Sequence, residues 1–144
     1  MSMTESTPHF TSDFISGFIG AWNAHDIAGM SSYYAPDYEE VDVAQAEPRR
    51  GPDDVRRYLR YYFRAFPDMT VNIDDVVANH ERAALYWTWR GTHRGTFMHI
   101  PPTGKAVTVR GSSLITFEDG RIQRALRIWD LAGLLRNIGL LPEL

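Results

Sequence analysis

The stretch RALRIWDLAGLLRNIG, residues 124–139, joins a predicted strand to a predicted helix, and the rest of the chain is interpreted from it. Residues 124–129 have the alternating character of a strand, in which successive side chains point to opposite faces. Asp130 follows at the position expected for the N-cap of a short helix, and Gly139 ends that helix. We therefore expect Asp130 to be a structural cap rather than a catalytic acid.

Arg127 is the residue of this stretch whose role needs an explanation. The period-two alternation of a strand gives one face with Ala125, Arg127 and Trp129 and an opposite face with Leu126 and Ile128. Both faces are partly apolar, as expected if one lines a cavity and the other meets a partner. We interpret Arg127 as inward-facing; the alternative is a side chain at the rim that reaches water.

Length and composition indicate one globular domain. A chain of 144 residues can bury about 68–70% of its unfolded surface, and we expect a short tail over residues 1–8 and a single domain over residues 9–144. No signal peptide and no apolar run of about 18 residues is recognisable, which favours a cytoplasmic location and argues against a membrane protein. The net charge of −3 argues against nucleic-acid binding, and the absence of cysteine excludes disulfides and thiolate chemistry.

Helical patterns come first in the chain and strand patterns follow. Apolar residues recur at helical spacing over residues 9–34, with a break before Asp26, and over residues 49–68. Alternating stretches predict strands over residues 38–44, 69–79, 82–95, 106–118 and 121–129. We predict an α+β fold in which helices pack on the concave face of a curled antiparallel sheet, a conical barrel whose mouth can hold a small molecule.

Six motifs spread over nearly the whole chain resemble one known family. In chain order they are AWNAHD (21–26), YAPDY (34–38), AFPD (65–68), GTHRGTF with IPPTGK (91–105), EDGRI (118–122) and WDLAGLLRNIGLLP (129–142). Together they resemble the SnoaL-like polyketide cyclase family of the NTF2-like (cystatin-like α+β) superfamily. The resemblance implies a conical barrel, a homodimer formed through the outer face of the sheet, and a ligand cavity that needs no metal or organic cofactor.

The family's chemistry, carried over by resemblance, meets a substitution in this chain. In these cyclases an aspartate on the last strand removes a proton next to a carbonyl, and the enolate closes a ring by aldol addition. Arg127 occupies the matching position, and Ser113 matches a family histidine on the preceding strand. A guanidinium stays protonated and has no acceptor, so Arg127 could stabilise an oxyanion or bind a carboxylate but could not act as the base.

Glu40 is the candidate that could replace the missing acid. It lies on the predicted 38–44 strand, and a buried Arg127 needs a partner because an isolated buried charge is costly. A solvated acid at the rim is the alternative for Glu40. Asp42 has the same phase and could contact substrate, although solvent exposure is the favoured interpretation.

The remaining candidates are a histidine and several pocket side chains. His93 in GTHRG could line the cavity, as the family histidine does, or shuttle a proton, and a purely structural role is equally open. No two histidines have the spacing of metal ligands, so no metal site is expected. The expected substrate contacts, besides Asp42, are Tyr34, Trp87, Trp89, Ser113 and Trp129.

The leading hypothesis is a cofactor-independent acid–base enzyme that cyclises or isomerises a hydrophobic or aromatic, carbonyl-bearing, polyketide-like molecule, with Arg127, Glu40 and His93 as catalytic candidates. One alternative is an epoxide hydrolase or a hydroxylase-like tailoring enzyme that uses the same pocket. The other is a non-catalytic small-molecule-binding protein, because Arg127 stands where the family has its catalytic aspartate. Whether the chain is an enzyme is therefore left open at this point.

Overall fold

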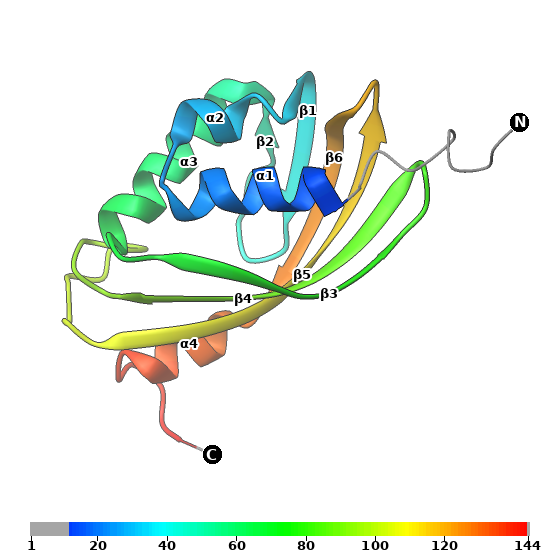
Figure 1. Ribbon diagram of the computed structural model, residues 1–144. Coiled ribbons are helices and arrows are strands. Elements are labelled where there is room, and N and C mark those ends of the chain that lie inside the picture. Colours follow the sequence, from blue (N-terminus) through cyan, green and yellow to red (C-terminus); the bar gives the residue numbers. More distant parts are fainter. Residues whose placement is uncertain (1–11, 144) are drawn as a thin grey trace, which may run out of the picture.

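The fold is an α+β arrangement in which a curled sheet wraps around three helices, as the computed structural model shows for residues 12–143 (Figure 1). The predicted tail over residues 1–8 lies outside the described residues. The helices are α1 (Ser12–Asn23), α2 (Ile27–Ser31), α3 (Gly51–Ala65) and α4 (Leu131–Asn137). The strands are β1 (Tyr34–Asp42), β2 (Arg49–Arg50), β3 (Thr70–Ala78), β4 (Arg82–Thr92), β5 (Ala106–Glu118) and β6 (Arg121–Trp129).

The sheet is mixed rather than wholly antiparallel. Its six strands follow the order β2-β1-β6-β5-β4-β3, so that β2 and β3 are open edges and the barrel is not closed. The pair β1–β6 is parallel, whereas the remaining pairs are antiparallel. The two strands of this pair lie far apart in the chain, so no tight hairpin forces an antiparallel arrangement. The parallel register pairs Asp42 with Arg127 and Glu40 with Ala125.

Two local expectations for the first half of the chain are wrong. The strand predicted to begin at residue 38 begins at Tyr34; its register shifts between Tyr34 and Glu39, and this irregularity accommodates Pro36, which cannot donate to a strand ladder. The helix predicted to begin at residue 49 begins at Gly51, because Arg49 and Arg50 form β2 and pair with β1. Gly51 has φ of +72°, which lets the chain turn from strand into helix.

The core lies between the concave face of the sheet and α3. The apolar stripe of α3 is buried as its spacing predicts, and its aromatic rings meet Trp89 of β4 in edge-to-face contacts. The opposite, outer face of the sheet carries large apolar side chains that are about half exposed, among them Val41, Leu114 and Ile128. None of the helices within residues 12–143 is long and apolar enough to cross a membrane.

The cap of α4 gives a first prediction. The Asp130 carboxylate accepts a hydrogen bond from the Gly133 backbone N–H at 2.8 Å, as expected of an N-cap. Asp130→Ala should therefore lower the free energy of unfolding by about 1 kcal/mol. Asp130→Asn keeps an acceptor oxygen, so its free energy of unfolding should stay close to that of the unmodified protein. Urea denaturation measures both, and equal losses in the two variants would show that the cap is not what stabilises this end.

Candidate active site

An apolar cavity of about 60 Å³ lies between the sheet and the helices that cover it. Helix α1 contributes Phe18, Ile19 and Trp22, and β4 contributes Trp87 and Trp89. The two tryptophans of β4 are buried. The side chains of the lining that carry polar groups include Tyr34, Tyr38, Glu40, Tyr58, Ser113 and Arg127.

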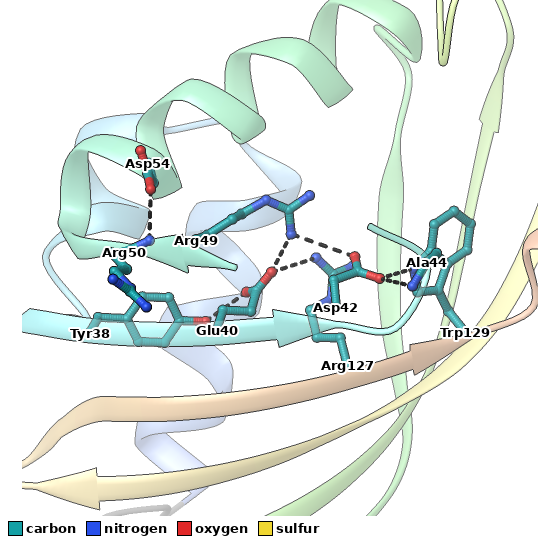
Figure 2. Close-up of polar contacts among 9 residues, drawn as sticks. All are labelled: Tyr38, Glu40, Asp42, Ala44, Arg49, Arg50, Asp54, Arg127 and Trp129. Atoms are coloured by element: carbon teal, nitrogen blue, oxygen red, sulfur yellow. Dashed lines mark hydrogen bonds and ion pairs between the residues drawn. The ribbon is translucent and has the colours of Figure 1, made fainter. Parts of the chain in front are cut away.

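Glu40 is the centre of a buried ion cluster at the wall of the cavity (Figure 2). Its exposure is 1%, so the alternative of a solvated rim acid is wrong. The Tyr38 hydroxyl donates to Glu40 Oε1 at 2.6 Å, and Arg49 Nη1 donates to Oε2. Arg127 Nη1 lies 3.8 Å from the same Oε2, which is an ion-pair distance but too long for a hydrogen bond.

Asp42 is buried in the same cluster, so the favoured expectation that it is exposed is wrong. Its exposure is 3%, and it accepts hydrogen bonds from Trp129 Nε1 and from the Ala44 backbone N–H, both at 2.9 Å. Arg49 Nη1 lies 3.5 Å from its second oxygen (Figure 2). The cause of the burial is the parallel register of β1 and β6, which puts Asp42 beside Arg127. Asp42 does not line the cavity; it holds Arg49 and Trp129.

Arg49 is the site residue that the sequence did not reveal. Its position before a strong helix pattern suggested the start of that helix, but in β2 it pairs directly with Glu40. Its guanidinium also lies 4.2 Å from the centre of the Tyr58 ring. The only signal for this placement was the pair of arginines directly before Gly51-Pro52, where a helix start would favour acids.

The formal charges of the cluster sum to zero, because Arg49 and Arg127 carry two positive charges and Glu40 and Asp42 carry two negative charges. Burial lowers the pKa of Arg127, but the charge of Glu40 and the neighbouring phenols outweigh burial, so the pKa lies above its ordinary value. The pKa of Arg49 is raised by the same balance of burial against Glu40. Both guanidiniums therefore stay charged at any pH at which the protein is folded.

Arg127 keeps a hydrogen-bond donor free. It is 8% exposed, and its Nη1 has no hydrogen-bond partner among the residues that the structure describes. Its guanidinium lies 5.6 Å from the Trp87 ring centre and 5.8 Å from that of Tyr58. A buried donor without a partner costs about 1–3 kcal/mol, so this group is poised to bind an acceptor that enters the cavity.

The other predicted site residues divide into two groups. Tyr34 and Ser113 line the cavity, and Ser113 Oγ accepts a hydrogen bond from Trp87 Nε1 at 3.0 Å. Trp129 does not line it and instead donates to Asp42. His93 also lies outside the cavity lining: it is fully buried, and its Nδ1 accepts from the Thr103 backbone N–H at 3.2 Å. The structure thus brings Glu40 and Arg127 together and leaves His93 apart.

Within residues 12–143, no group of three or more His, Asp and Glu side chains is arranged to hold a metal ion. The cluster pairs each carboxylate with a guanidinium, and this pairing leaves no set of oxygens free to converge on a cation. The cluster itself offers a carboxylate and a cationic donor to a bound molecule.

Four buried tyrosines give a prediction about pH. Burial is the main cause that raises the pKa of Tyr34, Tyr38, Tyr58 and Tyr62, and the charge of Glu40 adds to it. In the unfolded chain these phenols ionise near pH 10. The stabilisation is therefore complete below about pH 10 and is lost as the pH rises further, because unfolding then releases protons.

We expect the free energy of unfolding, measured by urea denaturation, to fall steadily above about pH 10, with tyrosinate absorbance appearing together with unfolding. In Tyr58→Phe one proton fewer is released on unfolding, so the free energy of unfolding should fall less steeply with pH. Tyr86→Phe, on the outer face, serves as the control and should not change the slope. A stability that stays constant up to pH 11 would contradict this account.

Comparisons with known proteins agree with the fold. The model of the SnoaL-like polyketide cyclase family matches residues 13–138. No curated protein matches the chain significantly. Among solved structures, AclR of Streptomyces galilaeus, a proposed hydroxylase, has 26% sequence identity and a TM-score of 0.81 over 99% of this chain and 86% of its own.

Two further solved structures are similar over most of their length. IdmH of Streptomyces antibioticus, a proposed polyketide cyclase, has 29% identity and a TM-score of 0.76 over 89% of this chain and 97% of its own. TsrD of Streptomyces laurentii has 25% identity and a TM-score of 0.80 over 90% of this chain and 94% of its own. The family match spans α1 to α4 and includes every residue of the ion cluster, so the chain belongs to the SnoaL-like polyketide cyclase family.

Proposed function

We propose that the protein is a cofactor-independent acid–base enzyme that cyclises or isomerises a carbonyl-bearing, polyketide-like molecule. The single observation that carries the proposal is the ion pair of Glu40 with Arg127 at the wall of an otherwise apolar cavity, with Arg127 Nη1 left without a hydrogen-bond partner in residues 12–143. A buried guanidinium with a free donor suits an oxygen on which negative charge develops.

Glu40 is the proposed base and Oε1 is the atom that accepts the proton. Oε2 is occupied by Arg49 and approached by Arg127, whereas Oε1 accepts one hydrogen bond, from Tyr38. A carboxylate oxygen has two lone pairs, so Oε1 keeps one for a substrate proton. When Glu40 removes a proton from a carbon next to a carbonyl, the C–H electrons move to the carbonyl oxygen, and Arg127 stabilises the resulting enolate.

The neutral charge balance of the cluster favours this step. Before proton transfer the negative charge is on Glu40, and afterwards it is on the enolate oxygen near Arg127. The number of buried charges is unchanged, so the step needs no new desolvation. The enolate carbon can then attack a second carbonyl of the same molecule, which closes a ring, and the alkoxide formed takes the proton from Glu40. In a conjugated enolate, a more distant carbon can take the proton from Glu40 instead, which isomerises the molecule.

Two alternatives use the same cavity. The similarity to AclR, described as a proposed hydroxylase, favours a hydroxylation-related or epoxide-hydrating variant as the second candidate. A binding protein without catalysis is the third, because the family's aspartate position holds Arg127. The close pairing of Arg127 with Glu40 supports an enzyme over a binder, since an apolar pocket alone would bind a hydrophobic ligand without two buried charges at its wall.

The proposal is tested with a reaction that does not require the natural substrate. The protein should accelerate the exchange of the acidic C–H protons of 2-tetralone for deuterium in D₂O, followed by NMR. Glu40→Gln and Arg127→Met should each reduce the enzyme-dependent rate by at least 100-fold, typical of losing a general base or an oxyanion donor. Glu118→Gln and Arg121→Met, which make the same substitutions on the exposed β5–β6 turn, should not change it.

Exchange no faster than in buffer would support the binding protein. Exchange that survives Glu40→Gln would exclude Glu40 as the base.

We also propose that two copies associate through the outer face of the sheet. Ala84, Leu114, Leu126 and Val41 lie in register across β4, β5, β6 and β1 and form an apolar row on this face. A patch of this kind is uncommon on a protein that works as a monomer.

Sedimentation velocity at micromolar concentration should give a dimer. Leu114→Asp should give a folded monomer, whereas Lys105→Glu in the loop before β5 should remain a dimer. A monomeric unmodified protein would refute this interface.

A further inference from the structure

Asp42 is a buried charge that the proposed chemistry does not use, and it does not line the cavity. Its Oδ1 atom accepts the hydrogen bonds from Trp129 Nε1 and the Ala44 N–H. Its Oδ2 atom accepts no hydrogen bond from the residues that the structure describes, but it lies 3.5 Å from Arg49 Nη1. Because an ionised oxygen in a buried position is costly without a nearby cation, Oδ2 is held there by its attraction to Arg49.

Arg49 contacts Glu40 through one nitrogen. Its Nη1 donates to Glu40 Oε2, and the same Nη1 is the atom that forms the ion pair with Asp42 Oδ2 (Figure 2). Within residues 12–143 the hydrogen bond to Glu40 Oε1 comes from Tyr38 and not from Arg49. A guanidinium frequently binds a carboxylate with two parallel N–H···O bonds, so the one-sided contact of Arg49 needs a cause.

The position of Asp42 supplies that cause. The Nη1 atom of Arg49 lies between one oxygen of Glu40 and one oxygen of Asp42, and both carboxylates attract it. If the guanidinium turned so that a second nitrogen reached Glu40 Oε1, Nη1 would move away from Asp42 Oδ2. That buried oxygen would then lose its ion pair, which opposes the rotation.

We propose that Asp42 is a positioning residue that holds Arg49 on Oε2 of Glu40 and thereby keeps Oε1 open to a substrate proton. The inference rests on the proposed function, which makes Oε1 the proton acceptor, and it adds how the cluster keeps that atom free. Without Asp42, Arg49 binds both oxygens of Glu40. A substrate proton then reaches Oε1 only after a hydrogen bond between two charged groups has been released.

Asp42→Asn tests the proposal because it changes the oxygen that faces Arg49 and little else. The amide keeps an acceptor oxygen for Trp129 and Ala44, whereas its nitrogen replaces Oδ2 and does not attract a cation. A crystal structure of Asp42→Asn should show Arg49 donating to both oxygens of Glu40, and one of the unmodified protein should show it donating to Oε2 alone. An Arg49 that stays on Oε2 alone in the variant overturns the proposal.

Proton exchange of 2-tetralone in D₂O gives a second readout. Asp42→Asn should lower the enzyme-dependent rate by about tenfold or more, the effect of releasing one hydrogen bond to a charged group. Adding Arg49→Lys to Asp42→Asn should bring the rate back to within about threefold of the unmodified protein, because an ammonium keeps the charge but does not form the two-bond pair. A purely structural Asp42 predicts neither the loss nor the recovery, and the absence of either one contradicts the proposal.

Glu39 of the same strand provides the matched control. It also pairs with an arginine of β2, since Arg50 Nε lies 3.3 Å from its Oε2, but both side chains of this pair are exposed. Exposed ion pairs contribute little, so Glu39→Gln should leave the exchange rate unchanged. Equal losses in Glu39→Gln and Asp42→Asn would mean that the net charge of the strand matters rather than the position of Asp42, which contradicts the proposal.

A second variant covers the case in which Asp42→Asn does not fold, because it leaves a buried positive charge unmatched. Asp42→Asn combined with Arg49→Gln keeps the cluster neutral. Asn retains the two hydrogen bonds of Asp42, and with Arg49 absent there is nothing to restrain, so this double variant should keep exchange within about threefold of the unmodified protein. A folded double variant with a much larger loss overturns the proposal.

The two readouts separate this inference from the proposed chemistry. If the unmodified protein does not accelerate exchange, or if exchange survives Glu40→Gln, the proposed chemistry fails, and the crystal structures alone decide whether Asp42 restrains Arg49. If exchange requires Glu40 but Arg49 stays on Oε2 alone in Asp42→Asn, the proposed chemistry stands and this inference fails.

Discussion

The buried pairing of Glu40 with two arginines is the constraint on which the rest of the structure depends. Charges in an apolar interior are tolerated only when they are matched and hydrogen-bonded. Three strands supply the partners of Glu40: Tyr38 lies on the same strand, β1, Arg49 on β2 and Arg127 on β6. The parallel pairing of β1 with β6 and the short return strand β2 are both needed to bring these groups together. The start of α3 at Gly51 follows from that return.

The same cluster accounts for the proposed chemistry despite an arginine at the position where the resemblance to the family leads us to expect an acid. An arginine at the position of an expected acid cannot remove a proton, but it can stabilise the charge that another acid creates. Glu40 lies one strand away and is close enough to share its charge with Arg127. Since proton transfer only moves a negative charge within reach of two guanidiniums, the protein can keep a dry site and still support charge development.

Two side chains of the cavity wall have a buried donor that is not hydrogen-bonded. Arg127 Nη1 and Trp22 Nε1 both lack a hydrogen-bond partner in residues 12–143, although most buried polar groups in proteins are satisfied. Both belong to side chains that line the same cavity. By contrast, Trp87 Nε1 and Trp129 Nε1 are paired, with Ser113 and Asp42.

By itself the sequence determined every helix and every strand except β2, their order, the inward face of β6 and the cap at Asp130, because these depend on local periodicity and on hydrogen bonds between residues a few positions apart. It also pointed to Glu40 as the partner of Arg127. Only the tertiary structure decided that Asp42 is buried, that Arg49 belongs to the site and that His93 does not line the cavity. These outcomes depend on which distant strands pair, in which direction and in which register, and a local pattern carries no information about that choice.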